Sequence, residues 1–252
     1  MTAVDFDHVA LATTDIGAAL DVAVGDLGGV VAHGGDGYGF RWVQTRLGTA
    51  TTGMTIELLV VWQPEVNDFL ARFVDRHGNG VHHMTFKVDN LESMLERARA
   101  LGLHPTGVSL DNPQWREAFL QPREAHGTVI QLAQTESAAG DFAQLVDRAA
   151  TTGIADGTPA WWPAPPARAE VPAVLRRVVI GGPARARARD FFSGFLDAEI
   201  IHDDDASTDL AWPGGQVRIV DAPGAGVLHL EATGLATRTV SLSGTTIRAA
   251  AD

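Results

Sequence analysis

The sequence predicts an α+β fold in which paired βαβββ modules form a cupped mixed sheet around a metal site. Three observations lead to this prediction: a repeat of about 75 residues, helices at matching places in both copies, and one histidine near the start of each copy. Self-similarity at a fixed period indicates a repeated structural unit. We therefore expect two modules, residues 5–78 and 79–150, in the first part of the chain.

The first strands of the two modules are recognisable by their histidines. His8 lies in the segment 6–11 and His83 in the segment 81–86, so the two histidines are 75 residues apart. A second pair of matching strands places Glu57 and Gln131 74 residues apart. Each copy thus carries one histidine and, 48 or 49 residues later, one side chain with a ligand oxygen.

A helix follows the first strand of each module. In the first copy it is expected to begin after Thr14 or Asp15 and to end at the Gly28-Gly29 pair. In the second copy it is expected to begin after Asn90 and to end at Gly102. The polar residue at the start, the apolar period and the glycine at the end all agree with a helix.

Further elements complete each module. Between helix and last strand there is room for two more strands, which include residues 39–46 in the first copy and 115–121 in the second. A connecting helix is expected near residues 68–76 and again near 141–148. Each module therefore has the order strand, helix, three strands.

The organisation changes after residue 155. Residues 156–172 contain five prolines, which disfavour a helix and predict an extended linker. We expect one domain over residues 1–155, this linker, and a degenerate, metal-free copy of the modules over residues 173–252. In that half Arg177 stands where the first module has His8.

Composition limits the classes of function. The net charge of −12 and the lack of a Lys/Arg stripe argue against nucleic acid as a partner. The absence of cysteine excludes disulfides, thiolate ligands and cysteine nucleophiles. The N-terminus has no signal-peptide pattern, and no apolar stretch is long enough for a membrane span, so we expect a cytoplasmic protein.

The repeat carries the candidate metal ligands. Side chains alternate between the two faces of a strand, so we expect His8, Glu57, His83 and Gln131 on the face away from the helices. Around a pseudo-twofold axis these four converge, and two imidazoles, a carboxylate and an amide oxygen suit one divalent ion: Zn, Ni, Co, Fe or Mn. His82 falls on the opposite face and is expected to be a core residue.

These modules resemble the vicinal oxygen chelate superfamily, which includes glyoxalase I, extradiol dioxygenases, bleomycin resistance proteins and methylmalonyl-CoA epimerase. The resemblance covers residues 5–135 and is closest to the epimerase. The segments that carry it are 6–10, 80–89, 130–134 and the turn from Pro122 to Gly127. It implies the paired-module fold, the metal site and a small-molecule substrate.

Two differences from the epimerases bear on the reaction. In those enzymes the first module supplies a metal-bound Gln and the second a metal-bound Glu, whereas here Glu57 and Gln131 have exchanged places. The epimerases also carry a Glu in the first module, in a region that corresponds to residues 39–44, which contain no acid here. Inversion at carbon commonly needs an acid or base on each face, and Glu57 is the evident one.

Three functional hypotheses follow. The first is an isomerase or epimerase that forms a metal-stabilised enolate from a small carboxylic acid or acyl-CoA, with Glu57 as catalytic base and ligand. The second is a glyoxalase-type lyase or an Fe(II) extradiol-type dioxygenase, and the third is a non-catalytic, drug-sequestering binding protein. Arg116, Arg123 and Lys87 are the candidate residues for an anionic substrate, and a homodimer is compatible with each hypothesis.

Overall fold

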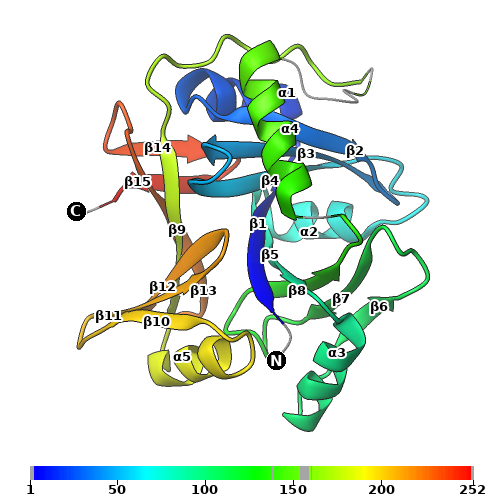
Figure 1. Ribbon diagram of the computed structural model, residues 1–252, viewed down its shortest axis with the longest axis vertical. Coiled ribbons are helices and arrows are strands. Elements are labelled where there is room, and N and C mark those ends of the chain that lie inside the picture. The colour runs from blue at the N-terminus through cyan, green and yellow to red at the C-terminus, as the bar shows by residue number, and fades with distance from the viewer. Residues whose placement is uncertain (1–2, 138, 154–158, 160, 251–252) are drawn as a thin grey trace. The chain divides into compact units, whose positions relative to one another are not determined.

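The computed structural model describes residues 3–137, 139–153, 159 and 161–250 of the chain. Within these residues the strands form two mixed sheets, one of eight strands and one of seven (Figure 1). Helices are interspersed among groups of consecutive strands. The predicted α+β class, with mixed sheets built from repeated modules, is confirmed.

The predicted module order recurs along the chain. The first module contains β1 (Val4–Thr13), α1 (Ile16–Leu20), the π-helical segment η1 (Asp21–Asp26), β2 (Val30–Asp36), β3 (Phe40–Gly48) and β4 (Gly53–Val61). The second follows α2 (Phe69–His77) and contains β5 (Gly80–Val88), α3 (Leu91–Ala100), β6 (Thr106–Ser109), β7 (Arg116–Leu120), β8 (Val129–Gln134) and then α4 (Ala139–Thr152). The C-terminal half contains β9 (Val174–Gly182), α5 (Arg185–Gly194), β10 (Glu199–Asp203), β11 (Ser207–Trp212), β12 (Gly215–Asp221), β13 (Gly226–Thr233), β14 (Thr239–Leu242) and β15 (Thr245–Ala249).

Sheet order follows from this repetition. The eight-stranded sheet runs β2-β3-β4-β1-β5-β8-β7-β6, and the seven-stranded sheet runs β10-β11-β12-β9-β13-β15-β14. Within a module the last strand pairs with the first in parallel, as β8 does with β5 and β12 with β9. The remaining neighbours inside a module are antiparallel hairpins, such as β3 with β4. This topology puts the histidine strand of each module beside the strand with the oxygen ligand.

The two predicted helix starts are confirmed by their caps. The Asp15 carboxylate accepts a hydrogen bond from the backbone N–H of Ala18 at 3.0 Å, and the Asn90 side chain accepts one from Ser93 at 2.9 Å. The first helix differs from the prediction in its second half, where η1 replaces a regular α-helix. There the N–H of Leu27 bonds to the carbonyl of Val22, five residues back, which widens the last turns.

The chain divides into two compact units. Unit I comprises Met1–His8, His83–Ala138 and Arg177–His229, and unit II comprises Val9–His82, Ala139–Arg176 and Leu230–Asp252. The expected domain and linker boundaries at residues 155 and 172 remain predictions. Residues 154–158 and 160 of the expected linker lie outside the described residues.

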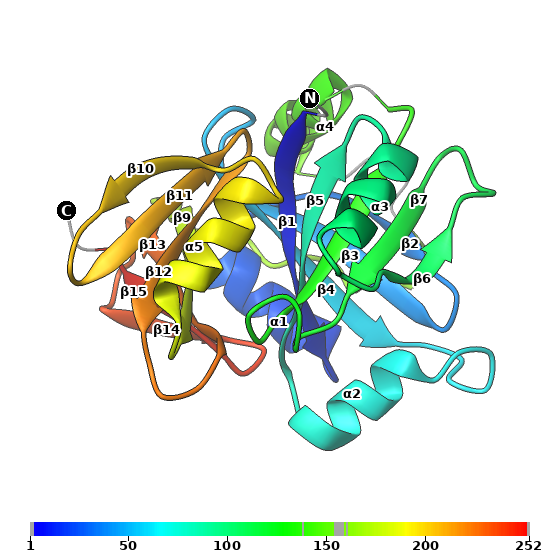
Figure 2. The same cartoon turned by 90° about the horizontal axis from the view of Figure 1, so that it is seen from below.

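Unit I is organised around an aromatic core. Phe86 contacts Phe6 and Trp212, with ring centroids 5.1 and 5.0 Å apart, and Phe192 of α5 lies 6.0 Å from Trp212. α5 packs against β11 and β12, as Figure 2 shows. The backbone N–H of Phe6 also bonds to the carbonyl of Pro213 at 2.9 Å. These contacts fix the start of β1, and with it the position of His8.

Unit II holds most of the first module and the end of the expected linker. The core between α4 and β2 contains Val30, Ala32, Val146 and Ala149. The end of the linker lies along η1, where the guanidinium of Arg168 donates to the carbonyl of Gly28 at 2.8 and 3.2 Å. These contacts tie residues 168–169 to the helical part of the first module.

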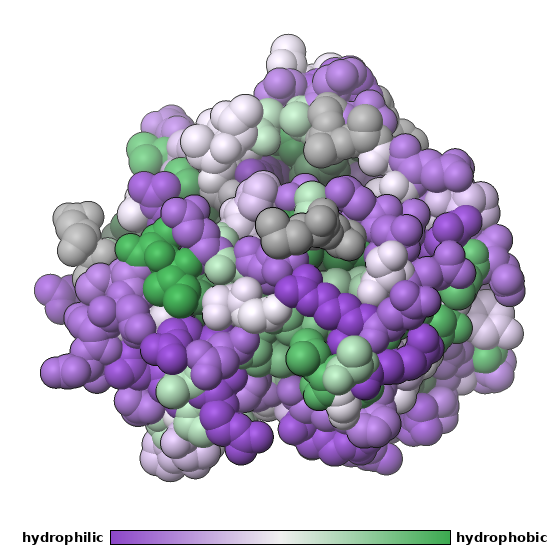
Figure 3. All heavy atoms as spheres, turned by 60° about the horizontal axis from the view of Figure 1, so that its bottom comes forward, coloured by the Kyte–Doolittle hydropathy of each residue, from purple (hydrophilic) through white to green (hydrophobic). Residues whose placement is uncertain are grey.

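The face drawn in Figure 3 is mainly hydrophilic, with smaller hydrophobic areas. This agrees with an excess of 31 acidic over 19 basic residues. Among the described residues, no helix combines the length and the apolar character that a membrane crossing requires.

Candidate metal site

Two buried histidines face each other in unit I. His8 of β1 is 1% exposed and His83 of β5 is 5% exposed. Their ring centroids lie 5.7 Å apart, with an interplanar angle of 66°. A buried imidazole pair at this distance is a suitable pair of ligands for one ion.

His82 has a different environment, although it is adjacent in sequence. It packs against Phe69 and Phe73 of α2, with centroid distances of 5.6 and 4.7 Å. Burial lowers its pKa to about 4, so the ring is neutral at physiological pH. His82 is half-buried and packs against α2, on the helix side that the alternation predicts.

Asp7 connects His8 to Lys87. Its Oδ2 accepts a hydrogen bond from His8 Nδ1 at 2.7 Å, and its Oδ1 lies 2.7 Å from Lys87 Nζ. Burial would raise the pKa of Asp7, but the hydrogen bond from His8 and the charges of His8 and Lys87 outweigh this effect and hold the pKa below its usual range. An ionised Asp7 can only accept, so a proton lies on His8 Nδ1, and Nε2 is the ring atom that could bind a metal.

A chain of hydrogen bonds runs from His8 to Glu117. Thr85 Oγ1 lies 2.9 Å from His8 Nε2 and donates to Gln131 Oε1 at 2.6 Å. Gln131 Nε2 donates to Glu117 Oε2 at 2.7 Å, and Trp115 Nε1 donates to the same oxygen at 2.9 Å. This chain fixes the amide orientation of Gln131 and the position of the Glu117 carboxylate.

The carboxylate of the ligand set comes from Glu57 on β4, in unit II. Glu57 is 9% exposed. Its cross-strand partner on β3 is Gln44, whose Nε2 donates to Glu57 Oε1 at 3.3 Å. The β3–β4 register therefore places Gln44 where it can orient the Glu57 carboxylate.

The three side chains fit a divalent ion. His8, Glu57 and His83 each offer one ligand atom, and these atoms all lie within 4.8 Å of one another. Two imidazoles with one carboxylate are a suitable donor set for a divalent ion.

Gln131, the fourth predicted ligand, is 6% exposed and is linked to His8 through Thr85. Its Oε1 points toward the Thr85 hydroxyl rather than toward open space. Its role as a ligand remains a prediction.

The three predicted substrate-binding cations lie in different environments. Lys87 is paired with Asp7 and lies 5.9 Å from the centre of the Trp115 ring. Arg116 alternates with Glu117 on β7 and so lies on the opposite face of that strand. Its Nε is buried without a hydrogen-bond partner among the described residues. Arg123 is exposed in the turn before β8.

Sequence reasoning missed Asp7, Thr85 and Glu117. Two of them have a signal in the sequence, since Asp7 precedes a ligand histidine and Thr85 lies two residues after the other, on its face of the strand. Glu117 belongs to the strand that pairs with β8, where its cross-strand partner is Ala133. Its contact with Gln131 depends on the register of that pair, which the repeat does not fix.

The C-terminal half has an ion-pair cluster where the first half has ligands. Arg177, which matches the ligand histidines, lies 2.8 Å from Asp209 Oδ2. Arg218, on the strand beside it, binds the same carboxylate at 2.6 and 2.7 Å. Asp209 is 5% exposed. Charge pairing therefore stabilises this half at the position that the candidate metal ligands take in the other.

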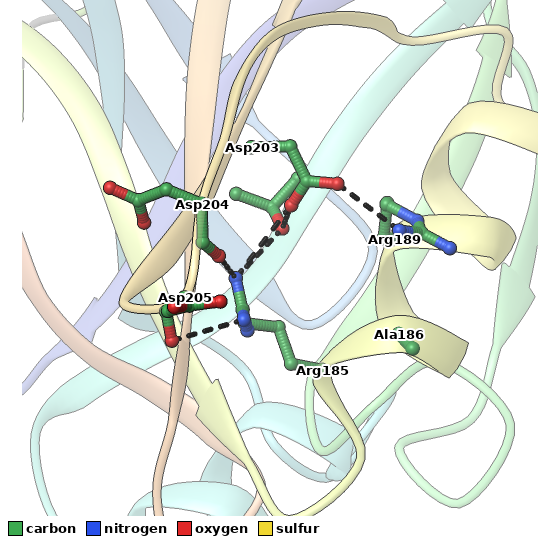
Figure 4. A pocket seen from close by; sticks show the side chains of 7 residues that line it. Arg185, Ala186, Arg189, Asp203, Asp204 and Asp205 are labelled. Atoms are coloured by element: carbon green, nitrogen blue, oxygen red, sulfur yellow. Dashed lines mark hydrogen bonds and ion pairs between the residues drawn. The ribbon is translucent and has the colours of Figure 1, made fainter.

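A polar pocket lies elsewhere in unit I, between α5 and the loop after β10 (Figure 4). Arg185 donates to the carbonyls of Asp204 and Asp205 at 2.6 and 3.2 Å, and Arg189 pairs with Asp203 at 3.1 Å. Residues 203–205 already bind both arginines, so the polar groups of this pocket serve to hold α5 against the loop.

Residues 7–119 match the sequence pattern of the glyoxalase/bleomycin resistance protein/dioxygenase superfamily. No curated protein matches the chain by sequence. A hypothetical protein from Staphylococcus aureus is similar in structure over 98% of this chain and 99% of its own, with a TM-score of 0.67 and 14% identity. At this identity the likeness shows the fold alone.

Two further structures match about half of the chain. Methylmalonyl-CoA epimerase from Mycobacterium tuberculosis covers 53% of this chain and 89% of its own, with a TM-score of 0.46 and 24% identity. A hypothetical protein from Bacillus halodurans covers 54% of this chain and 96% of its own, with a TM-score of 0.48 and 24% identity.

Proposed function

From the match of residues 7–119 to the glyoxalase/bleomycin resistance protein/dioxygenase superfamily, we propose that the chain is a divalent-metal-dependent isomerase or epimerase. Its substrate is a small carboxylic acid or an acyl-CoA thioester with a proton next to the carbonyl group. The reaction moves that proton through an enolate.

The observation that carries the proposal is the buried group of His8, Glu57 and His83, with ligand atoms within 4.8 Å of one another. A bound divalent ion would polarise a carbonyl oxygen and stabilise negative charge that develops on it. Asp7 supports this role because it accepts from His8 Nδ1 and so orients the ring with Nε2 as the atom that could bind a metal.

Glu117 supports an isomerase over the other reactions. Two acid–base groups suit inversion at carbon, and Glu57 alone would leave one face of the substrate without a proton donor. Glu117 Oε2 accepts from both Gln131 and Trp115, while its Oε1 has no hydrogen-bond partner among the described residues. We assign Glu57 the role of base and Glu117 that of the second acid.

Anionic groups on the substrate would meet cationic side chains. Lys87 lies on the His83 face of β5, with its charge balanced by Asp7. Arg123 is exposed beside the last strand, where it would meet the phosphates of an acyl-CoA. Arg116 would assist a carboxylate only after a change in its side-chain direction.

The test is deuterium exchange at the α-carbon of candidate acyl-CoA thioesters in D₂O, followed by mass spectrometry. Wild-type protein should exchange the proton, and Glu57→Gln and Glu117→Gln should each lose exchange by about a hundredfold or more. Glu65→Gln, at an exposed position, is the matched control. Metal content is measured for each variant, and full exchange by both site variants would contradict the proposed roles.

A second candidate function rests on the same donor set. Two histidines and one carboxylate are also the ligands of non-haem Fe(II) oxygenases. O₂ consumption with catechols by the iron-loaded protein, without α-proton exchange, would favour a dioxygenase over the isomerase.

A further inference from the structure

Three polar side chains form a row across unit II, on the face of the sheet that carries Glu57. The strands β2, β3 and β4 are neighbours in that sheet (Figure 1). His33 of β2 pairs with Gln44 of β3, and Gln44 pairs with Glu57 of β4. Residues directly opposite each other on antiparallel strands have their side chains on the same face. The three side chains therefore lie on one face of unit II.

The next row on the same face contains Gly35, Trp42 and Leu59. A Cβ added at Gly35 would lie 3.5–3.6 Å from Cζ2, Cε2 and Nε1 of Trp42, so the nitrogen side of the indole extends over this glycine on the outermost strand. The imidazole of His33 meets the indole edge-to-face, with ring centroids 5.0 Å apart and an interplanar angle of 82°. An aromatic surface thus lies beside the polar row.

The polar groups of these side chains are available to a ligand. Among the described residues, neither the His33 ring nor Trp42 Nε1 has a hydrogen-bond partner. Gln44 donates its amide N–H to Glu57 Oε1 at 3.3 Å, and its own oxygen has no partner in the same part of the chain. His33 is exposed, while Trp42 and Gln44 are half-buried. Partial burial of the His33 ring lowers its pKa below the usual value, so the ring is uncharged at neutral pH.

These groups suit an uncharged polar ligand. The indole N–H of Trp42 donates, the amide oxygen of Gln44 accepts, and the neutral imidazole of His33 can do both. A carboxylate or phosphate here would lose hydration without gaining an ion pair from any of the three. An amide or hydroxyl group, which donates and accepts, gains partners for both functions.

We propose that His33, Trp42 and Gln44 form a substrate subsite for an uncharged amide or hydroxyl group. Neighbouring strands are about 4.8 Å apart, so the backbones at His33 and Glu57, two strands apart, are separated by roughly 10 Å. This inference rests on the proposed function in one respect, because Glu57 marks the end of the substrate that reacts. The subsite favours a thioester with an amide-bearing arm over a small free acid, which is too short to span both positions.

The test combines a change in the ligand with a change in the protein. The probes are unreactive carboxymethyl thioethers of similar length whose arm is 2-acetamidoethyl or pentyl, and their affinities are measured by isothermal titration calorimetry. Trp42→Phe and His33→Phe keep a ring and remove the polar nitrogen atoms. In each variant we expect the ratio of amide-probe to alkyl-probe affinity to fall by about three- to tenfold, as for the loss of one hydrogen bond between uncharged groups.

Trp62→Phe is the matched control. It removes the same N–H from an indole that lies on the opposite face of the hairpin, where the guanidinium of Arg41 is 3.4 Å from its ring centre. This variant should keep the wild-type ratio. Equal ratios in wild type and both subsite variants overturn the inference, and so does tighter wild-type binding of a third probe with a 3-carboxypropyl arm.

A measurement on wild-type protein covers the case in which a variant does not fold. In ¹H–¹⁵N spectra the indole N–H of Trp42 should move downfield when the acetamidoethyl probe is added and not when the pentyl probe is added. An unchanged position of this signal at saturating acetamidoethyl probe overturns the inference.

Deuterium exchange at the α-carbon of acyl thioesters with the same arms separates the subsite from the proposed function. Equal kcat/KM for exchange with both arms would keep the function and overturn the subsite. Selective binding of the acetamidoethyl probe that both subsite variants lose, without exchange of either thioester, would support the subsite and overturn the function.

Discussion

Replacing Asp7 with Asn removes the charge that links His8 to Lys87 and keeps the size of the side chain. In the native protein both carboxylate oxygens are in use, one with His8 Nδ1 and one with Lys87 Nζ, each at 2.7 Å. An Asn at this position has one acceptor oxygen and one NH₂ group. One of the two neighbours must then face a donor, and a charge-assisted hydrogen bond is lost.

The size of the effect follows from these contacts. A ligating histidine usually donates a hydrogen bond from the ring nitrogen that does not bind the metal. Loss of the group that accepts this bond typically lowers metal affinity by about 10- to 100-fold, or about 1.4–2.8 kcal/mol. A hydrogen bond to a charged group contributes about 1.5–3 kcal/mol, so the two estimates agree. The side chains of Asp7 and Lys87 are 18% and 31% exposed, so solvent screens the pair only in part.

The assay is competition for Zn²⁺ and Co²⁺ between the protein and a chelating dye at neutral pH. Asp75→Asn, at an exposed position of α2, makes the same change in net charge and should leave the affinity unchanged. If folded Asp7→Asn binds metal as tightly as wild type, metal binding by His8 does not depend on its hydrogen bond to Asp7, and the reasoning is refuted.

Two further predictions concern stability. Asp209→Ala leaves Arg177 and Arg218 without the buried carboxylate they share, and should lower the free energy of unfolding in urea by about 3 kcal/mol; an unchanged value would contradict a stabilising cluster. The hydrogen bond from His104 holds the pKa of Glu124 below its usual value. The Glu124 carboxylate therefore stabilises the fold at pH values above its unfolded-state pKa, and this stabilisation is lost as the pH falls through its folded-state pKa. Glu124→Gln should therefore flatten the acid limb of the stability curve, and an unaltered slope would exclude this role.

Most of the fold could be predicted because the repeat provides independent evidence at each element. Asp15 and Asn90 cap the helices that the pattern predicts. The η1 segment could not be predicted, because the apolar positions of a π-helical turn differ little from those of an α-helix. Nor does a repeat in sequence determine which modules pack together, since that depends on contacts between distant segments such as Phe6 and Trp212.

The candidate site was predictable in part for a similar reason. His8, Glu57 and His83 follow from matched spacing, and the structure brings them together. The contact of Glu117 with Gln131 depends on side-chain length and strand register, which leave no repeated signal. Under the proposed function, Glu117 on β7 would supply the acid that residues 39–44 lack.

Metal analysis of purified protein, with His83→Ala beside wild type, tests the central claim most directly. The account predicts roughly one divalent ion per wild-type chain, as expected for a single mononuclear site. It predicts a folded His83→Ala variant that has lost this ion, since one of the two imidazole ligands is gone. Wild-type protein that takes up no divalent ion, or a His83→Ala variant that retains it in full, would contradict the account.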